Sequence, residues 1–360
     1  MKFKEKLGVP FVFLAILVVM ACSVGSVSAA NNIHDITIDD TNTDIQHPVA
    51  NIQDTSILNK VIGTDHITIS EAVRGTITSS NLYNQITSSA YTYIDQGTYG
   101  GDVSNCMINN AIKNSANEIF FQQGVFDGNA QNCMLNNAVT NVDGYSFIGQ
   151  GVFGSVQNSL VNNNVKNVDG MSLLEQGYLG TVKESMINNA INDFSGISYI
   201  QQGIDNGLVQ DCLVNNVVIN SSGNSEIHQG TDYCNVQNSC LNNLVYGSEG
   251  NTSITQNKIS NSQLLNKIMF SENTAIIQGT GTWTTPEQSI SCYGSLVNCN
   301  ITNIVLGSKN SIIFETDLTN VNGICVMIGC TDYTIGYGGL TDKNFFMIRV
   351  NNKTIINILK

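Results

Sequence analysis

The sequence predicts an all-β protein, a single-stack parallel β-solenoid (β-helix) with rungs of 26 or 27 residues and capping ends. Gln-Gly recurs six times between Gln96 and Gly230 at that spacing, and Asn-Asn recurs six times with its first Asn 14 residues before a Gln. Within a unit, repeated and variable positions alternate, which is the two-residue period of a strand. Such a unit cannot bury its apolar face alone and must stack on its neighbours.

The repeated positions are assigned to the interior. Slots 10, 12 and 14 after the first Asn hold a Ser, an aliphatic residue and a Gln, as in Ser146, Ile148 and Gln150. Rungs stack about 4.8 Å apart, so identical inward amides can bond to one another in ladders. The predicted ladder residues are Asn110, Asn137, Asn163, Asn189, Asn216 and Asn243, together with Gln96, Gln123, Gln150, Gln176, Gln202 and Gln229.

Glycines and the decay of the pattern set the predicted turns and boundaries. A Gly eight residues after the first Asn indicates a turn with strained backbone, at Gly144, Gly170, Gly196, Gly223 and Gly250. Leu82-Tyr83 stands in the Asn-Asn slot before Gln96, as expected of a degenerate edge repeat. We expect an amino-terminal segment or cap over 31–75, solenoid repeats over 76–283, and irregular rungs with a cap over 284–360.

Residues 1–30 have the pattern of a secretory signal peptide. Lys2, Lys4 and Lys6 precede an apolar stretch and a small-residue segment that ends at Ala30. Cleavage after Ala29 or Ala30 is favoured, and the alternatives are a lipid anchor at Cys22 or an uncleaved membrane anchor. Each reading predicts an extracellular or cell-surface location, with membrane contact only through an uncleaved signal or the lipid anchor.

Charge excludes one class of partner. Charged residues make up 12% of the chain, the net charge is −13, and Arg74 and Arg349 are its two arginines, which argues against nucleic-acid binding. No cofactor is predicted. Carbohydrate-cleaving solenoids need converging carboxylates or basic residues beside them, and no such cluster is visible, so we expect no enzyme.

The repeat resembles the right-handed parallel β-helix of pectate-lyase type, including adhesin-like surface proteins of methanogenic archaea. Asn-rich corners such as 186–191, Met-Ile-Asn-Asn-Ala-Ile, carry that resemblance beside the Gly-rich turns. It implies a noncatalytic, adhesin-like protein with a structural or binding role. Two alternatives stay open: a β-helix carbohydrate-active enzyme (a polysaccharide lyase or glycoside hydrolase), and a self-assembling fibre subunit, since 198–203 is similar to curlin-type repeats.

One outward slot carries the candidate ligand-binding residues. Slot 11 holds Tyr93, Phe120, Phe147, Leu173 and Tyr199, which stacking would align into one stripe. Exposed apolar patches of this kind commonly bind a partner, here a glycan or a cell-envelope component. The alternative is that the segment 31–74 or a terminal loop folds along the stripe and covers it.

Two further sets of residues are candidate sites. Asp143 and Asp169 occupy equal slots in adjacent units and could share a calcium ion, but solvated turn residues explain them more simply, so no metal is predicted. Cys106 and Cys133 share an inward slot that elsewhere holds Ser, which indicates a need for a small residue, although adjacent rungs would also allow a disulfide.

Overall fold

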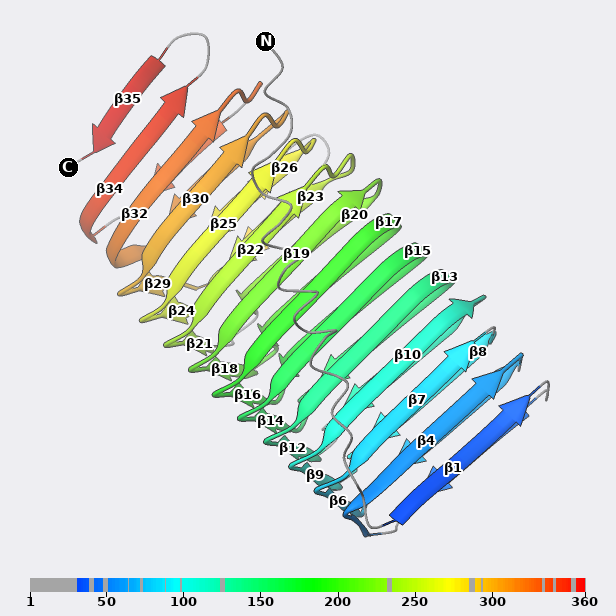
Figure 1. Cartoon of the computed structure of the whole chain (residues 1–360). Helices are drawn as coiled ribbons and strands as arrows, with labels where there is room; N and C mark the ends of the chain where they lie inside the picture. Colours follow the sequence, from blue (N-terminus) through cyan, green and yellow to red (C-terminus); the bar gives the residue numbers. More distant parts are fainter. Residues whose placement is uncertain are drawn as a thin grey trace, which may run out of the picture.

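A computed structural model describes residues 31–359, apart from 39–41, 48–50, 64, 72–73, 88, 98, 124–126, 232–234, 285–288, 293, 332–333, 339–340 and 351–353. The regular secondary structure of this part of the chain consists of strands. They coil into one elongated stack that follows the sequence from β1 at one end to β35 at the other (Figure 1). The predicted parallel β-solenoid is confirmed.

Each turn of the coil contributes to three faces. The first face contains β1 (Asn31–Ile38), β4 (Thr55–Ile62), β7 (Asn81–Thr87), β10 (Met107–Ser115), the first halves of β13 (Met134–Gln150), β15 (Leu160–Tyr178) and β17 (Met186–Ile204), then β19 (Leu213–Ser221), β22 (Cys240–Tyr246), β25 (Gln263–Met269), β30 (Asn300–Leu306), β32 (Leu318–Ile328) and β34 (Thr341–Val350). Its strands pair in parallel, and β35 (Thr354–Leu359) adds an antiparallel edge to β34.

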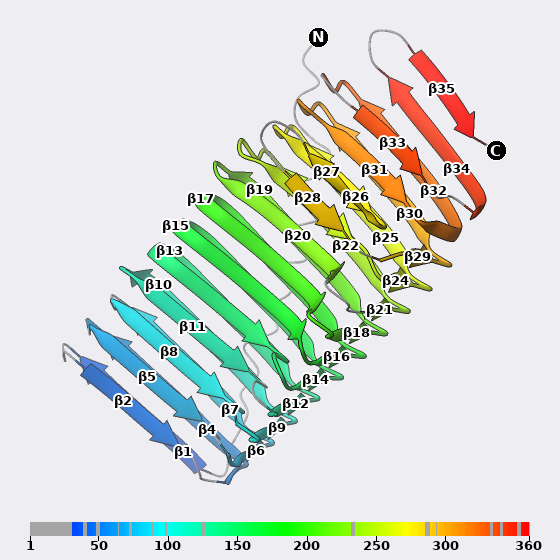
Figure 2. The same cartoon turned by 180° about the vertical axis from the view of Figure 1, so that it is seen from behind.

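The second face contains β2 (Asn42–His47), β5 (His66–Glu71), β8 (Tyr91–Gln96), β11 (Glu118–Gln123), the second halves of β13, β15 and β17, then β20 (Asn224–Thr231), β23 (Thr252–Gln256), β26 (Thr274–Gln278), β31 (Ile312–Thr316) and β33 (Thr334–Gly338). An antiparallel hairpin, β27 (Gly281–Thr284) and β28 (Ser289–Cys292), interrupts the coil after β26. Figure 2 shows this face and the hairpin.

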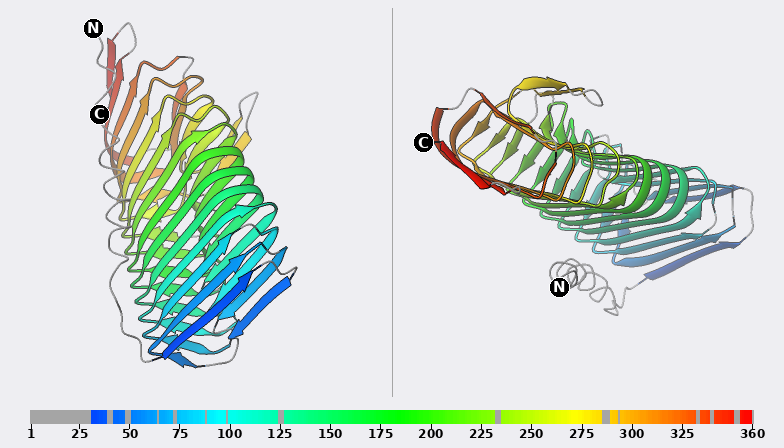
Figure 3. Two further views of the ribbon diagram at one scale, coloured as in Figure 1. Left: turned by 45° about the vertical axis from the view of Figure 1, so that its right-hand side comes forward. Right: turned by 90° about the horizontal axis from the view of Figure 1, so that it is seen from above.

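The third face is short. It consists of β3 (Ile52–Gln53), β6 (Thr76–Thr78), β9 (Asp102–Ser104), β12 (Asn129–Gln131), β14 (Ser155–Gln157), β16 (Thr181–Lys183), β18 (Leu208–Gln210), β21 (Asn235–Gln237), β24 (Ile259–Ser260) and β29 (Leu296–Val297), and β29 pairs with the start of β32. Figure 3 shows the successive turns as loops of one coil.

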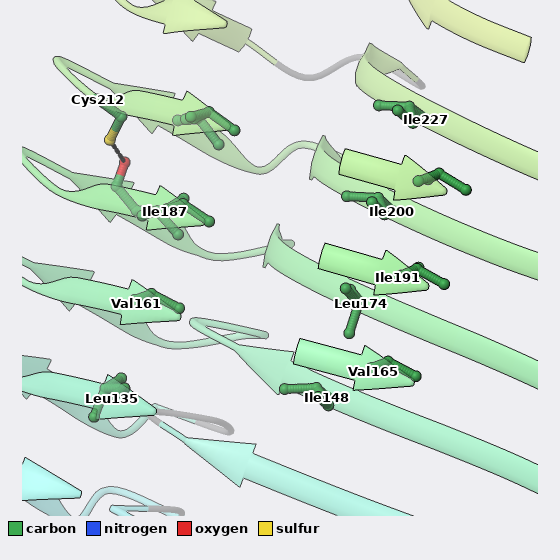
Figure 4. Packing of buried hydrophobic residues seen from close by; sticks show 14 of the residues in the cluster. Leu135, Ile148, Val161, Val165, Leu174, Ile187, Ile191, Ile200, Cys212 and Ile227 are labelled. Carbon is green, nitrogen blue, oxygen red and sulfur yellow. Dashed lines mark hydrogen bonds between the residues drawn. The ribbon is translucent and has the colours of Figure 1, made fainter. Parts of the chain in front are cut away.

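Columns of aliphatic side chains fill the interior (Figure 4). Leu135, Val161 and Ile187 extend from the first face, and Leu174 and Ile200 extend from the second, each at most 1% exposed. Burying such a side chain stabilises the fold by roughly 1.5–3 kcal/mol. Because equal positions stack, one inward aliphatic slot per strand becomes a continuous core.

Two amide ladders run through this core, as predicted. In the Asn ladder each side-chain nitrogen donates to the Asn of the next rung, from Asn59 to Asn303, at 2.7–2.9 Å. In the Gln ladder each nitrogen donates to the preceding rung, from Gln278 back to Gln96, at 2.7–3.1 Å. The two ladders therefore point in opposite directions.

Bonds between the ladders complete the network. Asn163 is typical: its nitrogen donates to Gln150 and Asn189, and its oxygen accepts from Asn137 and Gln150. Four bonds satisfy both polar atoms of the side chain, which is what makes a fully buried amide tolerable. Each rung thus fixes the register of the next.

A glutamate stands at each end of the Gln ladder. Glu71 and Glu315 are fully buried, and burial raises the pKa of each carboxyl to about 7. Glu71 accepts from Gln96 at 2.7 Å, and its other bonds come from Asn84 and Asn59. Glu71 accepts the terminal hydrogen bond of the Gln ladder, whereas Glu315 Oε1 accepts from Asn303 at 2.6 Å and from Cys325 at 3.0 Å, so the two carboxyl positions are chemically unequal.

The solenoid extends further towards the amino terminus than the sequence markers do. Counting 14 residues back from Gln96 places Leu82 in the first Asn slot, but Tyr83 pairs with Asn109 and Asn84 occupies the ladder position beside Asn110. Strands β1, β4 and β5 then continue the coil in parallel register. The expectation that 31–74 covers the stripe is wrong for the described residues, because they form rungs instead.

Of the predicted glycine turns, Gly223 and Gly250 lie between strands, as expected, whereas Gly144, Gly170 and Gly196 lie inside β13, β15 and β17. Gly144 and Gly170 do have positive φ, 138° and 139°, but each lies inside a continuous strand, where two glycines stack with their backbones in contact. Three residues earlier, Asn141 and Asn167 adopt left-handed backbone with φ of 57° and 52°. Asn tolerates that region better than most residues, so Asn makes the corner and Gly permits the bend after it.

The Cys slot is explained by one hydrogen bond. Cys133 Sγ donates to the carbonyl of Gln131 at 3.1 Å, and Ser159 Oγ donates to the carbonyl of Gln157 at 2.7 Å. Cys106 and Cys133 are both thiols rather than a disulfide. The slot therefore requires a small donor, which either residue supplies.

Candidate functional site

The aromatic stripe lies on the outer side of the second face. We define it as Tyr93, Phe120, Phe147, Leu173 and Tyr199, from β8, β11, β13, β15 and β17. The strand register places each of them directly beside the next, and Glu226 of β20 continues the column. The alignment that the spacing predicted is present, and ligand binding by these residues stays a prediction.

The rings of the stripe do not all present the same surface. Tyr93 and Phe120 stack with centroids 5.0 Å apart and planes 3° apart, so their faces cover each other and their edges point outward. Phe147 breaks this stack: its plane is tilted 43° from that of Phe120 at 5.8 Å. The stripe therefore does not present a uniform platform of ring faces.

Two outward columns flank the stripe and were not assigned a role from the sequence. One contains Tyr91, Glu118, Tyr145, Met171 and Ile197, and the other contains Asp95, Gln122, Gly149, Glu175, Gln201 and His228. Their residue types vary from rung to rung, so no repeat signal marked them. The slots two before and two after the stripe would have found them once strands were assumed.

The outer surface of the second face around the stripe is acidic. No outward position of β5, β8, β11, β20 or the second halves of β13, β15 and β17 carries Lys or Arg. Burial, and next the charge of Asp205, raises the pKa of Glu175 to about 7. Burial raises the pKa of Asp95 to about 6. Burial, together with Glu175 and Glu118, raises the pKa of Tyr145 to about 12.

The stripe ends where the chain covers its own sheet. In β23 and β26 the outward residues Ser253, Thr255, Ala275 and Ile277 are at most 3% exposed. The hairpin of β27 and β28 stands over this part of the face in both Figure 2 and the right-hand view of Figure 3. On β20, between the uncovered stripe and the covered strands, His228 Nε2 and Glu226 Oε2 lie 2.8 Å apart.

Asp143 and Asp169 lie on adjacent rungs at the bend between the first and second faces. They line two shallow hollows of ≈380 and ≈390 Å³, bordered by corner residues such as Asn141 and Asn167. Asp169 Oδ1 already accepts from Ser195 Oγ at 2.6 Å. Among the described residues, no three His, Cys, Asp or Glu side chains gather closely enough to hold a metal ion.

The predicted signal, including Cys22, lies outside the described residues. In the part of the chain that is described, no helix has the length and apolar character needed to cross a membrane. No known protein family matches the chain, and a search of curated proteins finds no similar sequence.

Proposed function

We propose that the protein is a noncatalytic, adhesin-like protein of the cell surface or extracellular space, whose aromatic stripe binds a glycan of a cell envelope. The observation that carries the proposal is the contrast along one face: the hairpin covers β23 and β26, whereas the stripe over β8 to β17 has no such cover among the described residues. Tyr93 is 39% exposed. Uncovered apolar surface of this kind commonly marks a binding site.

Three features support the location and the class. The amino-terminal sequence has the pattern of a secretory signal. The repeat resembles the pectate-lyase-type β-helix of adhesin-like archaeal surface proteins. The rigid stack of parallel strands would hold the stripe at a fixed spacing of about 4.8 Å per rung.

A glycan array with the full-length chain tests the proposal. The test variant replaces Phe120, Phe147 and Tyr199 with Ser. The matched control replaces Met134, Leu160 and Met186 with Ser, because these are outward apolar residues on the first face of β13, β15 and β17. We expect the wild type and the control to bind, and the test variant to lose binding.

Other results would overturn the proposal. Absence of glycan binding by the wild type would refute it, as would equal loss in the test and control variants. Release of new reducing ends from a bound oligosaccharide would make the protein an enzyme instead of an adhesin.

A further inference from the structure

One position of the stripe differs from the others because its flanking column is interrupted. Gln122, Gly149 and Glu175 occupy the same outward column on three consecutive rungs. The neighbouring rungs carry Asp95 and Gln201 there. Gly149 therefore opens a gap in a column that otherwise has polar side chains from β8 to β20.

The ring of Phe147 fills that gap. A Cβ atom built on Gly149 would lie 2.7 Å from Phe147 Cε1 and 2.8 Å from its Cζ, so the far edge of the ring reaches over the glycine. The same ring is tilted out of the stack that Tyr93 and Phe120 form. Phe147 thus leans along the strand and uncovers ring surface that a stacked neighbour would hide.

Hydrogen-bonding groups stand on both sides of this ring. Gln122 and Glu175 are half-buried and two rungs apart, about 10 Å along the stack. A Gln amide both donates and accepts. Because the pKa of Glu175 is raised to about 7 by burial and by Asp205, its carboxyl can also hold a proton to donate near neutral pH.

We propose that Phe147, Gln122 and Glu175, with the gap at Gly149, form a subsite for an uncharged sugar ring, which stacks on Phe147 while its hydroxyls bond to the two polar side chains. This inference rests on the glycan-binding function proposed above and names the sugar chemistry and the position. It makes Gly149 a specificity-determining residue, since only a glycine leaves room for the leaning ring.

Other occupants fit these groups less well. An apolar side chain from a protein partner would bury Gln122 and Glu175 without hydrogen-bond partners, which is unfavourable. An acidic polymer would meet Glu118 and Glu175 on a chain of net charge −13. A neutral sugar supplies both the apolar ring face and the hydroxyl groups that the surface requires.

Titration calorimetry with the full-length chain tests the subsite. The probes are neutral hexamers of β-linked glucose, mannose and xylose, and an acidic hexamer of galacturonate. The variants are Gly149→Ala, Phe147→Ser and Gln122→Ala, with Gln201→Ala as the control in the same column outside the subsite. Gly149 is not among the glycines with positive φ, and its new Cβ meets the flexible Phe147 ring and, at 3.3 Å, a methyl group of Val152. Gly149→Ala should therefore fold, which circular dichroism checks.

We expect the wild type to bind a neutral hexamer at least about tenfold more tightly than the acidic one. Gly149→Ala and Phe147→Ser should each weaken binding by about tenfold, while Gln201→Ala stays within about twofold. If the Phe120, Phe147 and Tyr199 triple variant loses glycan binding but Gly149→Ala and Gln122→Ala do not, the subsite is wrong and the proposed function stands. Equal binding of the acidic hexamer also overturns the subsite, and no sugar binding by the wild type overturns both proposals.

Discussion

Replacing Glu315 with Gln should stabilise the protein at alkaline pH. Every nitrogen of the Gln ladder donates towards the amino-terminal end, and Glu315 stands beside Gln278 on the next rung. Gln278 Oε1 accepts from Asn303, but it lacks the bond from a next-rung Gln that the other oxygens of the ladder accept. An ionised carboxylate has no hydrogen to donate there. Within the described side chains Glu315 Oε2 has no hydrogen-bond partner, and a Gln at this position would supply the missing donor.

The magnitude follows from the pKa of Glu315. Burial raises it from the ordinary 4.5 to about 7. Because the folded state holds the proton more tightly than the unfolded state, the contribution to stability is fully present below about pH 4.5 and is lost as pH rises through about 7. At about 1.4 kcal/mol per pKa unit, the loss at high pH is about 3 kcal/mol. Glu315→Gln should remove that loss.

Urea unfolding at about pH 5, 7 and 9 measures the effect, with amide hydrogen exchange of β31 to detect local opening of the carboxyl-terminal rungs. We expect Glu315→Gln to exceed the wild type by about 3 kcal/mol at pH 9 and to differ little at pH 5. Glu71→Gln is the comparison: three N–H groups already donate to Glu71, so an amide there places donors against donors.

The same slope of stability against pH in Glu315→Gln and the wild type would refute this reasoning. A destabilised Glu315→Gln at pH 9 would refute it more directly, because it would mean that the buried carboxylate is better accommodated than an amide at the end of the ladder.

Three further predictions concern the coil itself. Asn163→Ala removes four buried hydrogen bonds and should lower the free energy of unfolding by about 2–4 kcal/mol in urea titrations, whereas Asn162→Ala, on the outer side of the same strand, should cost under about 1 kcal/mol. Gly170→Ala should destabilise by more than about 1 kcal/mol by thermal unfolding, because φ is 139° and the new Cβ overlaps the carbonyl of Gly144; unchanged melting would contradict this. Cys133→Ser should keep the unfolding free energy within about 1 kcal/mol, since the hydroxyl can make the bond that the thiol makes now.

The buried core could be predicted from the sequence, because residues at the same position in successive repeats become neighbours when the rungs stack. Asn110 and Asn137 could be paired by counting, and the structure joins them at 2.9 Å. Counting repeat positions failed at Tyr83, because the rung that contains it is one residue shorter and lacks the Asn-Asn pair that marks the later rungs. A one-residue slip moves every side chain to the other face, so the amino-terminal rungs could not be assigned from spacing alone.

The surface was harder to predict, because outward positions vary without changing the fold. Phe147 was identified by its slot, but its tilt depends on the absence of a side chain at Gly149, two residues away on the same strand. The hairpin between β26 and β29 added a cover for one part of the face that no repeat position could indicate. Ring geometry and cover both depend on neighbours that are not repeated.

The opposed directions of the Asn and Gln ladders also determine how the side-chain dipoles add along the axis of the solenoid. Each amide side chain is a dipole, and a single ladder would add its dipoles head to tail, as the peptide groups of an α-helix do. Here every rung adds one dipole pointing each way. The interior is therefore polar without building a field along its axis, so rungs can be added by duplication with no growing electrostatic penalty at either end.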